Sequence, residues 1–169
     1  MSPVLLILAH LAVIAYALVA GVFLAFSDFI MRALSITSGP GGAEAMQAIN
    51  REVFRWVFMT LFLGLAPVSL LLAACGALIV GHGPGTVMAL AGLTYVLGCF
   101  GVTVVFNVPM NTALAGMDAS ADATLTYWAG TYLPRWTFWN TVRAGACTLS
   151  AVLLSASLVW VARMQVQTG

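Results

Sequence analysis

Apolar residues fill four long stretches of this chain, and shorter polar segments separate them. The stretches run from Pro3 to Phe26, from about Trp56 to Val80, from Thr86 to about Phe106 and from about Phe138 to Ala162. A helix needs about 20 apolar residues to cross the hydrocarbon core of a bilayer, which is roughly 30 Å thick. The pattern therefore predicts an all-α membrane four-helix bundle with both termini on one side of the membrane.

The predicted spans are joined by one very short turn, Gly81–Gly85, and by two longer polar connections. In the first long connection we expect the helix to continue through Arg32 and to break at Ser38–Gly42. Asp28 and Arg32 are four residues apart, which is the spacing of an ion pair on one helix face. Glu44 falls in the first turn of the next helix, where the helix dipole favours a negative charge.

In the second long connection we expect Asn107–Asn111 to end or kink the third span. The reason is Pro109, which lacks a backbone donor and crowds the preceding helical turn. A short helix is predicted from about Ala119, with Asp118 or Ser120 as its N-cap.

Composition narrows the class of protein. Apolar residues make up 62% of the 169 residues, against the roughly 45–50% usual for soluble proteins. Charged residues make up only 7%, which is too few to cover the surface of a soluble domain. The composition therefore excludes a soluble enzyme, a nucleic-acid-binding protein and a disordered segment, and it predicts a lipid bilayer as the partner of the outer surface.

The charged residues are concentrated in or beside the two long connections, and only Arg163 lies near the opposite face. By the positive-inside rule, the arginine-rich connections are predicted to be cytoplasmic. The N-terminal apolar run has no basic segment before it, so we expect a span rather than a signal peptide. We expect the membrane to be a bacterial inner membrane, because the compact Gly39–Gly42 connection is bacterial in style.

The chain matches itself when it is shifted by 80 residues. The matched pairs are Gly21 with Gly101, Val22 with Val102, Phe26 with Phe106, Ala33 with Ala113, Leu34 with Leu114, Arg55 with Arg135, Trp56 with Trp136 and Phe58 with Phe138. We interpret this as a tandem repeat, about 1–80 and 81–169, within a single membrane domain. Because each repeat has two spans, the two long connections would meet at one face and form a shared pocket there.

One helix face near the start of the fourth span carries Trp136, Asn140 and Arg143, at positions i, i+4 and i+7. An arginine at the start of an apolar span is costly and usually faces a cavity or a partner. Two interpretations of Arg143 stay open. It forms a structural ion pair with Asp28 or Glu52, or it belongs to a donor cluster that binds an anionic or enolate oxygen.

Other polar and aromatic residues also have two interpretations. Amide side chains can hold helix junctions together or bind a ligand, and this applies to Asn50, Asn107, Asn111 and Asn140. Tyr127 and Trp128 fit an aromatic belt at the membrane interface, or they stack on a ligand.

The histidines and cysteines predict no metal site, because no set of His, Cys, Asp and Glu has ligand spacing. For His10 we expect a hydrogen bond to a serine or tyrosine of a neighbouring span; the alternative is an axial ligand of haem or a metal. Cys75, Cys99 and Cys147 lie in apolar runs and are expected to act as small apolar residues.

Four motifs resemble those of the anthrone oxygenase-like family of small membrane proteins, which is related to fungal noranthrone monooxygenase. They are Ala25–Leu34, Met46-Gln47-x-Ile49-Asn50, Phe106–Asn111 and Trp136-x-x-Trp139-Asn140-x-x-Arg143. Together with the four spans, the resemblance covers nearly the whole chain.

This resemblance implies oxidation of an anthrone to an anthraquinone by molecular oxygen, without flavin, haem or metal. In that reaction Asp28 would remove a proton, while Asn140 and Arg143 would hold the enolate oxygen. The residues expected to bind the flat aromatic substrate are Arg32, Gln47, Asn50, Asn107, Asn111, Trp128, Tyr132, Trp136 and Trp139.

Two other functions stay open at this point. The chain could be a non-catalytic membrane module that binds a quinone, a lipid or a partner protein in the same pocket. It could also be a metal- or haem-dependent redox protein that uses His10. Small residues in the spans favour close helix packing and leave a homo-oligomer open; they are Gly21, Gly64, Gly76, Gly98, Gly101 and Gly145.

Overall fold

The computed structural model describes residues 1–168 as an all-helical bundle with no strand in that range. Four continuous helical rods are long and apolar enough to cross a membrane: Pro3–Ser35, Trp56–Val80, Pro84–Ala115 and Asp122–Gln167. The predicted membrane four-helix bundle is therefore confirmed. The tandem repeat stays a prediction.

The rods are built from α-helices interrupted by π-helical turns, which are labelled η. In chain order the elements are α1 (Pro3–Ala25), η1 (Phe26–Ile30), α2 (Met31–Ser35), α3 (Gly41–Glu52), α4 (Trp56–Cys75), η2 (Gly76–Val80), α5 (Pro84–Tyr95), η3 (Val96–Gly101), η4 (Thr103–Asn107), α6 (Val108–Ala115), α7 (Asp122–Tyr127), η5 (Trp128–Tyr132) and α8 (Leu133–Thr168).

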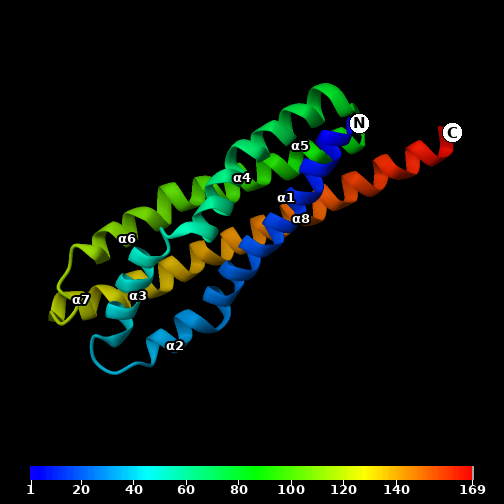
Figure 1. The fold of residues 1–169 in the computed structure, drawn as a ribbon. Coiled ribbons are helices and arrows are strands. Elements are labelled where there is room, and N and C mark those ends of the chain that lie inside the picture. Colours follow the sequence, from blue (N-terminus) through cyan, green and yellow to red (C-terminus); the bar gives the residue numbers. More distant parts are fainter. Residues whose placement is uncertain (169) are drawn as a thin grey trace.

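The bundle is elongated, and α1 packs along α8, which in turn packs along α5 (Figure 1). The N- and C-terminal ends lie at the same end of the bundle, and α2, α3, α6 and α7 gather at the other end. Large apolar side chains such as Ile7, Leu11, Ile14 and Leu18 are exposed along the outer face of α1. This surface requires an apolar solvent, so the protein is a membrane protein.

Pro109, which was expected to end or kink the third span, lies inside a helical rod instead, and so does Pro134. Pro109 is in α6, directly after η4, and Pro134 is in α8, directly after η5. A π-turn shifts the backbone bonds from i−4 to i−5 and leaves a place where a missing N–H is tolerated. The third and fourth rods therefore run further into the connections than the predicted limits of Phe106 and Phe138.

Two local predictions in the connections were wrong. Asp28 and Arg32 form no ion pair, because η1 changes the helical phase between them. Neither Asp118 nor Ser120 is an N-cap, since α7 begins at Asp122. Instead the Ser120 hydroxyl and backbone N–H both donate to the Asp118 carboxylate, which lowers the pKa of Asp118 and orders the turn. Glu44 lies in the first turn of α3, as predicted.

The end of the bundle that holds the termini is closed by backbone contact between α4–η2 and α5. A Cβ atom on Gly76 would lie 2.5 Å from the carbonyl oxygen of Gly85, and one on Gly92 would overlap the carbonyl oxygen of Ser69. Only glycine permits this approach. Nearby, Tyr16 and Ser69 share a buried hydrogen bond of 2.6 Å, and the Tyr95 hydroxyl donates to the Phe62 carbonyl at 2.7 Å.

A methyl group at Gly92 is expected to force α4 and α5 apart. Overpacking of this kind typically costs about 1–3 kcal/mol, so Gly92→Ala should lower the melting temperature of the detergent-purified protein. The matched control is Gly64→Ala, because nothing lies within 4 Å of a Cβ at Gly64. An equal loss of stability in both variants would contradict the packing role of Gly92.

Candidate functional site

A cavity of about 400 Å³ lies between α1, α3, α4, the η3–η4 segment and α8, near the end of the bundle that carries the connections. Its aromatic lining consists of Phe23, Phe26, Phe54, Phe58, Phe62, Phe100 and Trp136. Its polar lining consists of Asn50, Thr103, Asn111 and Arg143. The cavity is therefore an apolar, aromatic chamber with a small group of polar atoms.

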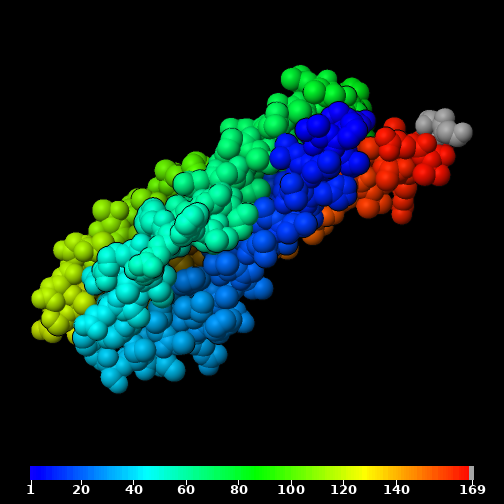
Figure 2. All heavy atoms as spheres, in the orientation of Figure 1, coloured from blue at the N-terminus to red at the C-terminus, as the bar shows by residue number. Residues whose placement is uncertain are grey.

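The cavity opens sideways, toward the surface that contacts lipid. Its rim includes Phe54, Leu63 and Val104, whose side chains are exposed. In Figure 2 the atoms of α8 are visible between α1 (blue) and the start of α4 (teal), on the face where the cavity lies.

Arg143 is the most unusual residue of the cavity wall, because its charged side chain is only 4% exposed. Its Nη2 donates to Asn140 Oδ1 at 2.8 Å, and its Nη1 donates to Thr103 Oγ1 at 3.3 Å. The guanidinium carbon lies 4.2 Å from the centre of the Phe23 ring and 5.1 Å from that of Trp136. Neutral dipoles and aromatic faces thus hold the cation.

No carboxylate in the described part of the chain neutralises Arg143. Glu52 is instead paired with Arg55 at 2.6 Å on the surface, and Asp28 is exposed. The predicted structural ion pair of Arg143 with Asp28 or Glu52 is therefore wrong. Burial of an unpaired charge is costly, so the site favours any ligand that brings a negative or partly negative oxygen to Arg143.

Asn140 positions Arg143 and ties α8 to α1. It is fully buried, and its Nδ2 donates to the Phe23 carbonyl at 2.6 Å and to Ser27 Oγ at 2.7 Å. Phe23 lies where α1 is about to enter η1, and such junctions disturb the regular backbone bonding. With its Nδ2 committed to α1, the Oδ1 atom of Asn140 is left facing Arg143.

Two buried polar atoms near this cluster have no partner within residues 1–168. They are Arg143 Nε, a donor, and Asn107 Oδ1, an acceptor. Asn107 Nδ2 donates to the Trp136 carbonyl at 3.3 Å, so the amide is oriented while its oxygen stays unpaired. Buried polar groups are rarely left unpaired, and these two indicate unused capacity for a polar ligand or water.

A second polar group joins α3 to α6 and to the aromatic segment before α8. Asn111 Oδ1 accepts from the Tyr132 hydroxyl and from Trp136 Nε1, each at 2.8 Å. Asn50 Nδ2 donates to the Tyr132 hydroxyl at 3.3 Å. Gln47 Nε2 donates to the carbonyl oxygens of Leu114, near the end of α6, and of Met117, just beyond it. Asn50 and Asn111 therefore hold the connections together and also line the cavity, whereas Gln47 holds the connections together but lies outside the cavity lining.

The aromatic residues of the fourth rod form a ladder. Trp128, Tyr132 and Trp136 stack in turn, with ring centres 5.4 and 6.3 Å apart. Trp128 and Tyr132 are buried in a small core with Met31 and Met46, so they are neither in a membrane belt nor in the cavity. Trp139 stacks on Phe106 at 3.6 Å, also outside the cavity.

The structure thus brings together only some of the predicted site residues. Asn50, Asn111, Trp136 and Arg143 line the cavity, and Asn140 and Asn107 lie behind it. Asp28 and Arg32 are exposed and line no part of it.

His10 is exposed, and its Nδ1 atom lies 2.8 Å from the Leu6 carbonyl of its own helix. The predicted bond to a neighbouring span is therefore wrong. No group of three His, Cys, Asp or Glu side chains that could hold a metal occurs in the described residues.

Sequence reasoning missed the phenylalanines of the cavity. Phe58 and Phe62 are stacked with ring centres 6.1 Å apart, Phe23 meets Phe58 edge-on at 5.7 Å, and Phe100 lies 5.9 Å from Phe62. In an apolar span a phenylalanine has no distinguishing signal, because lipid-facing and cavity-facing positions use the same residue types.

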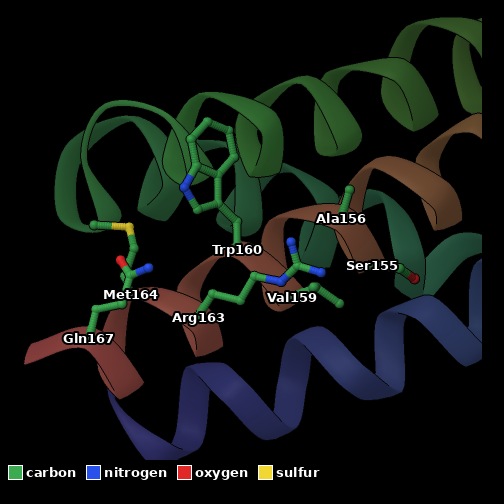
Figure 3. A pocket seen from close by; sticks show the side chains of 7 residues that line it. All are labelled: Ser155, Ala156, Val159, Trp160, Arg163, Met164 and Gln167. Atoms are coloured by element: carbon green, nitrogen blue, oxygen red, sulfur yellow. The ribbon is translucent and has the colours of Figure 1, made fainter. Parts of the chain in front are cut away.

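A second hollow follows the last turns of α8, at the opposite end of the bundle (Figure 3). All of its lining residues come from this one helix, including Ser155, Trp160 and Arg163. Trp160 points toward the neighbouring helices, and a Cβ on Gly83 would lie 3.1 Å from its ring. Since a single helix forms its wall, this hollow is a weaker candidate than the cavity at Arg143.

Fold and cavity define a four-span membrane protein with a lipid-accessible aromatic chamber and an unneutralised arginine. A family model described as anthrone oxygenase matches residues 54–153, so the chain belongs to the anthrone oxygenase family. No curated protein and no solved structure matches the chain.

Replacing Asn140 with alanine should both destabilise the bundle and release Arg143. Loss of a buried hydrogen-bonding group that leaves partners unsatisfied costs about 1–3 kcal/mol, which a thermal melt in detergent would detect. The control is Thr148→Ala, because the Thr148 hydroxyl bonds only to the Ala144 carbonyl within α8. If Asn140→Ala melts like the control, Asn140 does not join the two helices.

Proposed function

We propose that this protein is a cofactor-independent oxygenase that converts an enolisable, anthrone-like aromatic dissolved in the membrane into the corresponding quinone. The observation that carries the proposal is Arg143, a buried cation without a carboxylate partner in the wall of an aromatic cavity. Such a cation is suited to an oxygen atom that gains negative charge during a reaction.

The shape and chemistry of the cavity support a flat, hydrophobic substrate. A volume of about 400 Å³ falls within the usual range for small-molecule sites. Phenylalanine rings on α1, α4 and η3 offer faces and edges for stacking with a polycyclic aromatic. The lateral opening supports entry from the bilayer, where such a molecule would concentrate.

The proposed reaction needs no external reductant. Loss of a proton from the CH₂ group of an anthrone gives an enolate, whose oxygen would accept from Arg143. The enolate carbon donates an electron pair to O₂, so a C–O bond forms and oxygen is reduced to a peroxide. Loss of the second C–H proton then breaks the O–O bond, which gives the new carbonyl and one water. The low dielectric of the cavity would strengthen the attraction between Arg143 and the enolate.

The site of proton removal is where this proposal departs from the sequence-based assignment. No carboxylate among residues 1–168 lines the cavity, and Asp28 lies outside it. Stabilisation of the anion by Arg143 makes the substrate a stronger acid, so water at the cavity mouth can take the proton. Asp28 therefore has no role in the proposed step.

A binding-only function is the second candidate, and the absence of an acid or base from the described lining of the cavity favours it. In this case the same arginine would hold the carbonyl oxygen of a quinone without turnover. The two candidates differ only in chemistry, so measurements of binding and oxygen uptake on the same sample separate them.

The deciding experiment measures oxygen uptake by the detergent-purified protein supplied with anthrone, together with anaerobic binding of anthraquinone. We expect one O₂ consumed per anthraquinone formed. Arg143→Met should reduce the rate by roughly 10²–10³-fold, which is the usual effect of removing one oxyanion donor. The matched control is Arg135→Met, because Arg135 lies on the same helix but is exposed and outside the cavity.

Three results would change the interpretation. Binding without oxygen uptake would establish the binding-only function. Neither binding nor uptake, in a protein that melts normally, would exclude both candidates. Loss of turnover in Asp28→Asn, with unchanged binding, would restore Asp28 as the base and contradict the proton path described above.

A further inference from the structure

Two of the three cysteines lie against each other in the middle of the bundle. Cys147 of α8 and Cys99 of η3 are both fully buried, and their Sγ atoms are 3.1 Å apart. Their approach depends on small neighbours, since a Cβ on Gly98 would lie 2.8 Å from the Cβ of Ala146. Sequence reasoning treated these cysteines as separate apolar residues and missed the contact.

The thiol pair lies one helical turn from the cluster that holds Arg143. Cys147 follows Arg143 by four residues, and Cys99 precedes Thr103 by four, so the two pairs are successive levels of one helix–helix contact. Hydrogen bonds also connect the thiol pair to the arginine cluster. Thr103 Oγ1 donates to the Cys99 carbonyl at 2.8 Å and accepts from Arg143. Phe100, Thr103 and Arg143 line the cavity, and the two thiols lie behind this wall rather than in the lining itself.

We propose that Cys99 and Cys147 form a redox-active dithiol, which a lipophilic hydroperoxide entering the cavity from the bilayer oxidises to an intramolecular disulfide. The third cysteine, Cys75, is a poor partner for either. It is the last residue of α4, which runs toward the end of the bundle that holds the termini. The proposal goes beyond the oxygenase function and does not depend on it.

The oxidation is balanced without any further reagent. One sulfur attacks the terminal peroxide oxygen, so the O–O bond breaks, an alcohol leaves and a sulfenic acid forms. The second sulfur then attacks the first, an S–S bond forms and the oxygen leaves as water with the second thiol's proton. Two electrons pass from the thiol pair to the peroxide in total.

Formation of the disulfide would move the wall of the cavity. A disulfide has an S–S distance of about 2.05 Å, so the two sulfurs must move closer by about 1 Å. They lie on η3 and α8, and the same two segments carry Thr103 and Arg143 one turn away. Oxidation would therefore shift the arginine cluster and connect the redox state of the membrane to the site.

The test counts free thiols in the full chain reconstituted in lipid vesicles. The protein is treated with cumene hydroperoxide, denatured in detergent and labelled with a maleimide-linked polymer that adds a countable mass per thiol. We expect three labels before treatment and one after, with an intact mass lower by two hydrogens and a linked peptide containing Cys99 and Cys147. The matched control, Cys75→Ala, should fall from two labels to none.

Two outcomes would overturn the proposal. One is that the folded protein keeps all three labels although a glutathione standard in the same vesicles is oxidised, which shows that the cumene hydroperoxide was active. The other is a gain of oxygen atoms without the linked peptide, which would mean independent oxidation of single sulfurs. The variant Cys147→Ala should show no loss of two hydrogens. Because the readout needs neither a ligand nor turnover, failure of the oxygenase proposal leaves this test intact.

Discussion

The buried contact between Asn140 and Arg143 is the interaction on which the organisation of the site depends. Asn140 uses both of its functional ends: its Nδ2 binds the first rod at Phe23 and Ser27, and its Oδ1 binds the guanidinium of Arg143. The same amide therefore fixes the relative position of two spans and orients the charge. Because a charge in an apolar environment needs oriented dipoles, the fold and the site share this residue.

The bilayer places a second constraint on the protein, because it is the solvent of the outer surface. Outward faces must stay apolar, so polar groups are restricted to the interior and to the connections. The cavity follows the same rule, because apolar residues make up most of its wall and six of them are phenylalanines.

The limits of sequence-based reasoning are clearest at the π-turns. The i, i+4 spacing of Asp28 and Arg32 predicts a pair in a regular helix, but η1 inserts a wider turn and separates them. Pro109 was expected to end or kink the third span, yet it follows a π-turn that tolerates it. Wider turns change both the phase and the hydrogen-bonding pattern of a helix, and the one-dimensional sequence has no strong signal for them.

The sequence by itself determined the class of protein, the number of spans, the turn after the second span and the presence of an arginine near the start of the fourth span. These properties depend on local composition, because about 20 apolar residues suffice for a span and a lone arginine is conspicuous within one. Only the tertiary structure decided which side chains meet: Arg143 with Asn140 and Thr103, the phenylalanines of the cavity, and Cys99 with Cys147. Such contacts depend on the rotation and closeness of helices that are distant in sequence, and in apolar spans many rotations look alike in composition.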